Sequence, residues 1–391
     1  MNRNWLLPEY IEDILPPFSW RLERARRDIL DLFWSHGYEL IQPPLLEYLE
    51  SLLTGTGRDL DLKTFKLVDE LSGRHMGLRA DITPQVARID AHLMNYKGVN
   101  RLCYSGSVLQ TKPDNMMGTR EPLQIGAELF GHAGLESDFE IQSLMVEALA
   151  LAGVKEVVID LGHVAIFRAL VSQSEKSAAR EMDLFQALQR KDARLLSELT
   201  ADLDSGLKQA FRALPNLNGD IGVLATARLQ LPANTSGPRP APIHAALDEL
   251  ERLGAMLSRR NIRAAYDLAE LRGYHYHSGI VFAAYANGFR DAVAKGGRYD
   301  EVGKAFGRAR AATGFSMDLR EALSNGELPS RCGVLAPNVS DTAELDAAIA
   351  LLRKNGERVV KELPGISADA TELGCDRHLV FESGKWQVKL I

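Results

Sequence analysis

The chain has 391 residues, of which 46% are hydrophobic and 25% are charged, values that are ordinary for a globular protein with a sizeable core. Its 52 acidic and 46 basic side chains give a formal net charge of −6, whereas a protein that wraps nucleic acid normally has an excess of Lys and Arg. No apolar run reaches the roughly 18–20 residues that a membrane span requires, and no apolar signal segment is recognisable near Met1.

The three cysteines, Cys103, Cys332 and Cys375, are widely separated and form no C-x-x-C pair. Their odd number and spacing argue against a disulfide framework and against a zinc site built from cysteines. We therefore expect a protein of the reducing cytoplasm.

The first 161 residues alternate between amphipathic and β-like segments. A helix is predicted over residues 17–36, because apolar residues recur every three or four positions before Gly37. The motif Ser137-x-x-Glu140 is read as a capping box that opens a second helix ending at Gly153. Short strands are predicted over residues 38–41, 64–68, 75–78, 101–108, 123–129 and 155–161. Turn-rich stretches separate them, which favours an antiparallel sheet in an α+β fold.

The second half contains a predicted insertion and a change of character near the end. Residues 164–231 read as an inserted helical subdomain, followed by a loop over 232–242 and a helix over 243–260. Strands are predicted over residues 263–268, 279–285 and 290–295, and a strand leading into a helix over 310–323. The expected domains are a core of residues 1–328 and a small α/β domain of residues 329–391, whose strand and helix precede a hairpin ending at residue 391.

No common catalytic motif stands out in the sequence. There is no Walker A, G-x-S-x-G or H-E-x-x-H motif. His275 and His277 would point the same way on a strand, so a metal site and a hydrogen-bonding wall are both open. A catalytic zinc ion needs a third ligand, which no neighbouring His or Cys supplies, so the hydrogen-bonding role is favoured.

Three segments place polar groups where a ligand could meet them. Asp81 follows a predicted strand, Glu128 lies within another, and Arg272 precedes a run of aromatic residues. Buried carboxylates are costly unless they are paired, so the two acids indicate a surface for a cationic or donor-rich ligand. An amino acid would suit this surface, because its ammonium seeks carboxylates and its carboxylate seeks an arginine. Structural ion pairs are the alternative.

These segments resemble the catalytic core of class II aminoacyl-tRNA synthetases, specifically the histidyl type, over about residues 5–325. The stretch ending in Gln42-Pro43-Pro44 resembles motif 1, which forms the dimer interface in that family. The further matches are residues 104–128 with motif 2, residues 272–279 with the histidine-specific signature, and residues 296–300 and 314–317 with the later signature and motif 3. The resemblance implies an antiparallel sheet flanked by helices.

The departures from this family concern ATP. Synthetases hold the triphosphate with arginines of motifs 2 and 3. At the corresponding positions this chain has Gln110, Gly118 and Glu321, and Lys112 replaces an acid. A carboxylate in place of an arginine would repel phosphate by about 1–4 kcal/mol at ~4 Å. We therefore expect no catalytic residue, no metal ion and no cofactor.

The amino-acid pocket of the family is largely retained. The resemblance implies that histidine binds to Asp81, Thr83, Gln124, Glu128, Arg272, Tyr276, His277 and Tyr299. Two of these residues differ from the family: Asp81 stands where the family has a glutamate, and His277 stands where it has a tyrosine.

A histidine pocket without its ATP-binding groups resembles the regulatory subunits of ATP phosphoribosyltransferase, a family related to the synthetases. This resemblance implies a non-catalytic subunit that activates the short-form catalytic subunit in the first step of histidine biosynthesis. It also implies a part in feedback inhibition by histidine, and a homodimer through the motif 1-like region within a hetero-oligomer. The alternatives are an aberrant histidyl-tRNA synthetase and a synthetase-like module that senses an amino acid or binds tRNA or another enzyme. The net charge of −6 disfavours tRNA.

Overall fold

The structure, a computed structural model, describes residues 6–55, 58–94, 96–113, 118–232, 242–326, 332–339, 343–365 and 369–391. The chain divides into a larger unit, Met1–Asp13 with Leu22–Gly326, and a smaller unit, Ile14–Arg21 with Glu327–Ile391. The expected boundary between residues 328 and 329 lies outside the described residues. No helix within the described ranges is both long enough and apolar enough to cross a membrane.

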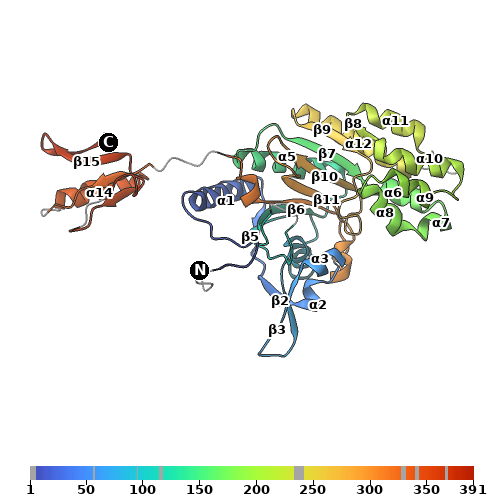
Figure 1. Cartoon of the computed structure of the whole chain (residues 1–391), viewed down its shortest axis with the longest axis horizontal. Coiled ribbons are helices and arrows are strands. Elements are labelled where there is room, and N and C mark those ends of the chain that lie inside the picture. Colours follow the sequence, from blue (N-terminus) through green and yellow to red (C-terminus); the bar gives the residue numbers. More distant parts are fainter. Residues whose placement is uncertain are drawn as a thin grey trace. The chain divides into compact units, whose positions relative to one another are not determined.

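A nine-stranded sheet forms the centre of the larger unit (Figure 1). Its strands, in spatial order, are β1 (Glu39–Leu40), β5 (Asn100–Ser107), β6 (Leu123–Phe130), β12 (Ala312–Asp318), β11 (Ala294–Arg298), β10 (Ile280–Tyr285), β7 (Val158–His163), β9 (Arg263–Asp267) and β8 (Asn218–Gly219). All neighbours are antiparallel except β1 with β5 and β7 with β9, which confirms the predicted sheet type. The strand predicted over residues 290–295 is wrong, because β10 ends in a turn with Gly288 at φ +89° and pairing resumes only at Ala294.

Two long helices cover one face of this sheet, α5 (Leu135–Leu151) and α12 (Pro242–Arg259) (Figure 1). The predicted capping box at Ser137 is wrong, because α5 begins at Leu135 with Gly134 as its N-cap. Ser137 Oγ donates to the carbonyls of His132 and Gly134 instead of accepting from an N–H group. Helix α1 (Phe18–Ser35) matches its prediction, and its Phe33 packs edge-on against Phe315 of β12 at 6.0 Å.

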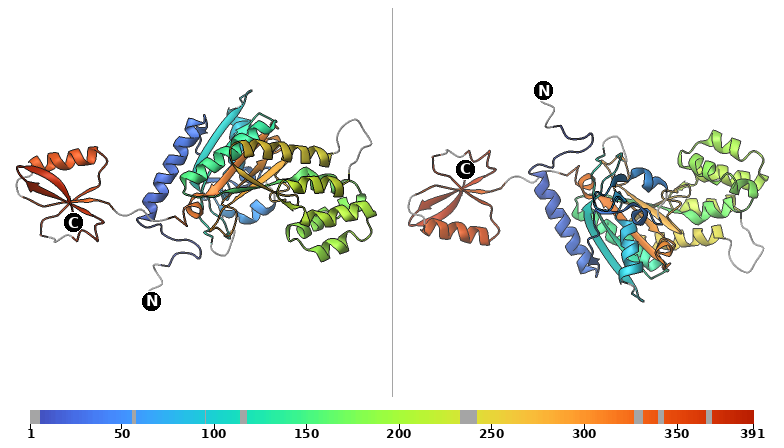
Figure 2. Two further views of the ribbon diagram at one scale, coloured as in Figure 1. Left: turned by 90° about the horizontal axis from the view of Figure 1, so that it is seen from above. Right: turned by 90° about the horizontal axis from the view of Figure 1, so that it is seen from below.

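The inserted segment is helical, as predicted. Its helices are α6 (Val164–Val171), α7 (Glu175–Ala178), α8 (Glu181–Gln189), α9 (Ala193–Leu199), α10 (Ser205–Ala213), a 3₁₀ turn (Leu214–Asn216) and α11 (Gly222–Gln230). They form a separate cluster beside one end of the main sheet, coloured green in Figure 2. Most of the predicted loop over 232–242 lies outside the described residues.

A smaller three-stranded sheet projects from the larger unit (Figure 1). Its order is β2 (Leu46–Tyr48), β4 (His75–Leu78) and β3 (Phe65–Val68), with α2 (Leu49–Leu52) and α3 (Arg58–Lys63) between the strands. Helix α4 (Thr83–Arg88) continues into a π-helical stretch, Ile89–Met94. A 3₁₀ helix (Val302–Phe306) precedes β12, and α13 (Leu319–Ala322) follows it.

The smaller unit contains a mixed four-stranded sheet and helix α14 (Ala343–Lys354). The strand order is β14 (Val359–Lys361), β13 (Val334–Ala336), β15 (Arg377–Glu382) and β16 (Lys385–Leu390). The predicted hairpin is present, and its turn residues Ser383 and Gly384 both have positive φ, at 51° and 76°. Strand β14 has only three residues and was not predicted from the sequence.

A buried ion pair between Arg298 and Asp138 joins β11 to α5, and we expect it to be essential for stability. The two groups approach to 2.6 Å with side-chain exposures of 9% and 1%. Removing one partner of such a pair leaves a buried charge, so Arg298→Ala should lower the free energy of unfolding by roughly 3–5 kcal/mol in urea denaturation. The exposed pair of Arg194 with Glu198 provides the control. Arg194→Ala should change the free energy of unfolding by less than about 0.5 kcal/mol. Equal effects of the two variants would contradict this prediction.

Candidate ligand-binding site

A cavity of about 820 Å³ lies against the sheet face that carries Glu128 and Gly314. All eight residues predicted to bind histidine line it: Asp81, Thr83, Gln124, Glu128, Arg272, Tyr276, His277 and Tyr299. They come from distant parts of the chain, and the antiparallel pairing of β6, β12 and β11 brings several of them together. They share one cavity, and what they bind stays a prediction.

Glu128 lies at the inner end of the cavity with a relative exposure of 1%. Its Oε1 accepts a hydrogen bond from Tyr104 at 3.0 Å, and its Oε2 accepts one from Tyr299 at 2.5 Å. No ion pair compensates its charge within the described part of the chain. Burial raises the pKa of the Glu128 carboxyl to about 8, although both tyrosine hydroxyls favour the charged form.

Gly314 on the neighbouring strand makes room for this carboxyl group. A Cβ atom at position 314 would lie 1.5 Å from Glu128 Oε2, far inside contact distance. Gly126 has a similar role, since a Cβ atom there would lie 2.5 Å from the Tyr104 hydroxyl. Only glycine can therefore occupy these two positions without displacing the polar groups at the inner end of the cavity.

Asp81, Thr83 and Gln124 form a fixed hydrogen-bond network beside Glu128. Asp81 Oδ1 accepts from the Thr83 backbone at 3.0 Å and from Gln124 Nε2 at 2.8 Å. Gln124 Oε1 accepts from the Ile82 backbone at 2.8 Å, which fixes the orientation of its amide. Asp81 Oδ2 makes no hydrogen bond to the described residues, so it can accept one from a ligand.

Residues 272–276 lie in turns and His277 in no strand, so the expectation that His275 and His277 share a strand face is wrong. Gly273 adopts φ +61°, and its carbonyl accepts from the backbone of Tyr276 and of His277. The described residues contain no cluster of His, Cys, Asp and Glu that could hold a metal ion.

The hydrogen bond of His277 fixes its tautomer. Nδ1 lies 3.1 Å from the carbonyl oxygen of Arg272, which can only accept, so Nδ1 carries the proton and Nε2 is an acceptor. Burial lowers the pKa of His277 to about 4, so the ring is neutral at pH 7. The hydroxyl of the adjacent Tyr276 is buried and has no partner among the described residues, as expected for a group that meets a ligand.

Arg272 lies in the outer part of the cavity. Its Nη2 donates to the Tyr285 hydroxyl at 2.8 Å, and its Nε is 3.6 Å from Glu270. Its side chain is 45% exposed, so it can reorient toward a ligand carboxylate without breaking a buried network.

The positions where synthetases hold ATP carry no arginine here. Gln110, Gly118 and Glu321 all line the cavity. Arg320 is directed away from it, because Nη2 pairs with Glu12 at 2.7 Å and Nη1 donates to the Glu121 carbonyl at 2.9 Å. The arrangement therefore offers groups for an amino acid and lacks the arginines with which synthetases hold a triphosphate.

Two parts of the site were not predicted from the sequence. One is Tyr104, which binds Glu128 and lies opposite Gly126 in the register of β5 and β6. A large residue facing a glycine across a predicted strand pair is the signal that could have revealed it. The other is the wall supplied by the insertion through the residues Met182, Phe185, Gln186, Gln189 and Arg190. No local sequence signal connects helix α8, which carries most of these residues, with the cavity.

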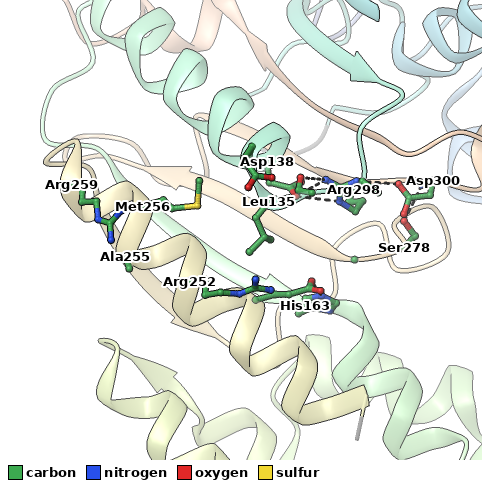
Figure 3. A pocket seen from close by; sticks show the side chains of 15 residues that line it. Leu135, Asp138, His163, Arg252, Ala255, Met256, Arg259, Ser278, Arg298 and Asp300 are labelled. Atoms are coloured by element: carbon green, nitrogen blue, oxygen red, sulfur yellow. Dashed lines mark hydrogen bonds and ion pairs between the residues drawn. The ribbon is translucent and has the colours of Figure 1, made fainter. Parts of the chain in front are cut away.

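A second cavity, of about 710 Å³, lies between the start of α5 and helix α12 (Figure 3). Arg252, Met256 and Arg259 of α12 line one side, and the Arg298 network lines another. His163 Nδ1 accepts from the Ala165 backbone, so Nε2 carries the proton and donates to Glu249 at 3.1 Å. None of the residues predicted to bind histidine lines this cavity.

Fold and cavity together define the class of protein: a class II synthetase-like core. The family model of histidyl-tRNA synthetase matches residues 10–322. A histidyl-tRNA synthetase from a Nostoc species has the same fold, with a TM-score of 0.78 at 18% identity over 99% of this chain and 97% of that one.

Closer relatives narrow the identification. The model of the ATP phosphoribosyltransferase subunit HisZ C-terminal domain matches residues 331–389. An ATP phosphoribosyltransferase regulatory subunit from Ralstonia pickettii is 56% identical over 389 residues, covering 100% of this chain and 98% of the relative. One from Nitrosospira multiformis is 54% identical over 390 residues and 98% of both chains. A structure named as such a subunit or a histidyl-tRNA synthetase, from Bacillus halodurans, gives a TM-score of 0.80 at 28% identity, covering 96% of this chain and 97% of that one.

The chain belongs to the family of ATP phosphoribosyltransferase regulatory subunits. It is accordingly the non-catalytic subunit of an enzyme complex, and a regulatory subunit implies a catalytic partner.

The burial of Glu128 predicts a specific pH dependence of stability. Its pKa is raised from 4.5 to about 8, so the native state retains a proton that the unfolded chain has lost. The stabilising contribution of this group is therefore complete below pH 4.5 and is lost as the pH rises through about 8. Glu128→Gln removes this dependence, so the variant should gain stability relative to wild type by about 1.4 kcal/mol per pH unit between pH 5.5 and 7.5. Urea denaturation of both proteins at pH 5.5 and 7.5 measures this difference. Free energies of unfolding that change equally with pH in the two proteins would contradict the prediction.

Proposed function

We propose that this chain senses histidine and regulates a short-form ATP phosphoribosyltransferase catalytic subunit in the first step of histidine biosynthesis. The observation that carries the proposal is one cavity in which the amino-acid-binding groups are present and the phosphate-binding arginines are absent. The family membership supports the regulatory role and the existence of a catalytic partner.

The cavity offers a complementary group for each part of histidine. Asp81 Oδ2 suits the ammonium, Arg272 suits the carboxylate, and the groups around Glu128 suit the imidazole. Neutral Tyr276 and His277 add one hydroxyl and one fixed acceptor nitrogen. Gln124 also holds Asp81 and Ile82 in place through the two ends of its amide.

Regulation then follows from differential binding. The catalytic partner is active in one arrangement of the complex, and histidine favours another. Histidine can shift this balance only by the difference between its affinities for the two arrangements. By linkage, the partner's active state must weaken histidine binding by the same factor.

A homodimer through the motif 1-like region is part of this proposal. Two large apolar side chains there are exposed, Trp34 at 67% and Leu40 at 48%, and both lie in the larger unit. Their exposure within the region that the synthetase family uses for its dimer interface supports this part of the proposal.

Co-expression with the short-form catalytic subunit tests the regulatory role. We expect the two chains to purify together, in a complex whose mass from light scattering corresponds to an even number of copies of this chain. Transferase activity should rise on adding this chain and fall on adding histidine. Unchanged transferase activity would overturn the proposal, and histidine-dependent exchange of pyrophosphate into ATP would indicate a synthetase instead.

Titration calorimetry with histidine tests the sensing role. Glu128→Gln keeps the shape of the side chain but removes the acid at the inner end of the cavity, which a donor-rich ligand could otherwise ionise, so affinity for histidine should fall at least about tenfold. Glu249→Gln, which changes an acid of the second cavity, is the matched control and should leave affinity unchanged. Wild-type affinity in Glu128→Gln would show that histidine does not bind here.

A further inference from the structure

Residues 272–277 contact both the cavity and the helical insertion. Tyr276 packs against Tyr299 at the inner end of the cavity, with ring centroids 5.0 Å apart. Tyr274, two residues earlier, stacks on Phe185 of α8 at 5.5 Å and meets Phe167 of α6 edge-on at 5.1 Å. His275 also lies against Phe185, at 5.8 Å. One short segment therefore touches the candidate ligand site and two helices of the insertion.

A hydrogen bond strengthens the contact with α8. The Tyr274 hydroxyl donates to Glu181 Oε1 at 2.7 Å, and Tyr274 is only 3% exposed. Glu181 is the first residue of α8. The position of this helix is thus tied to the position of Tyr274.

Arg168 of α6 holds the backbone of the same segment. Its Nη2 donates to the carbonyls of Tyr274 at 2.9 Å and of His277 at 2.8 Å. Its guanidinium also lies over the Tyr274 ring, 5.0 Å from the centroid. Because the guanidinium is planar and rigid, a shift of α6 must move both carbonyls together or break these bonds.

Helix α8 also forms part of the cavity wall itself. Met182, Gln186 and Gln189 line the cavity together with Phe185, and all are on α8. A ligand in the cavity therefore has two connections to the helical insertion. One is direct contact with α8 in the cavity wall, and the other runs through residues 272–277.

We propose that residues 272–277 act as a connector that transmits histidine binding from the cavity to the helical insertion. Histidine fixes Tyr276 and His277, and Tyr274, His275 and Arg168 then hold α6 and α8 in one position. The inference rests on the proposed function, in which histidine occupies this cavity. By linkage, contacts between the insertion and the connector must in turn raise histidine affinity.

Hydrogen exchange of the full chain with and without histidine tests the first half. Amides of α8 and of the connector should exchange several-fold more slowly when histidine is bound. Residues 377–390 of the smaller unit serve as the internal reference and should be unaffected.

Tyr274→Phe tests the reciprocal half. It removes one hydroxyl and leaves the ring stack, so histidine affinity should fall about three- to tenfold and the protection of α8 should be lost. Tyr38→Phe is the matched control. The Tyr38 hydroxyl donates to Glu140 over 2.9 Å, and neither residue lines the cavity. Arg168→Ala should weaken binding by tenfold or more, with the exchange of β6 amides reporting that the core remains folded.

The outcomes separate this inference from the proposed function. Two results together would overturn the connector and leave the sensing role intact. The wild type would bind histidine without any change in the hydrogen exchange of α8, and Tyr274→Phe would bind histidine with wild-type affinity. Equal losses in Tyr274→Phe and Tyr38→Phe would also overturn it, since they would reflect general destabilisation. No histidine binding by the wild type or its complex would remove the sensing role and the connector together.

Discussion

The architecture of the site depends on one buried carboxyl group that has no cationic partner among the described residues. Glu128 is buried on strand β6 and accepts hydrogen bonds from the Tyr104 and Tyr299 hydroxyls. Gly314 leaves the space that the Glu128 carboxyl occupies. Such a group is costly in an apolar interior, and it holds its proton to a pH well above its ordinary range. A fold that maintains this arrangement is prepared for a ligand whose donors can compensate the carboxylate.

The same cavity keeps side chains that suit an amino acid and lacks the arginines with which synthetases hold ATP. The network of Asp81 and Gln124 is held by hydrogen bonds, whereas positions 110, 118 and 321 offer no arginine to a triphosphate. Catalysis of adenylation would require positive charge where the phosphates develop negative charge. Its loss, with the amino-acid groups retained, is consistent with a subunit that regulates a separate catalytic chain.

Much of the fold was predictable because its signals are local. Helix α1, the helical insertion and strands β3 to β6 follow from periodicity and turn residues within a few positions. The errors also have local causes. The turn at Gly288 makes β11 begin several residues later than predicted. Ser137 donates to preceding carbonyl groups and does not cap α5. The eight candidate residues were found through resemblance to a family, and their roles toward a ligand are still predictions.

The sequence by itself determined the composition of the site, because residue types such as Asp81, Glu128 and Tyr299 fix which donors and acceptors exist. It also determined the absence of arginine at positions 110, 118 and 321. Only the tertiary structure decided that Tyr104 binds Glu128 and that α8 forms a wall of the cavity. The physical reason is that hydrogen bonds and packing act over a few ångströms, and these partners lie tens of residues or more apart in the chain.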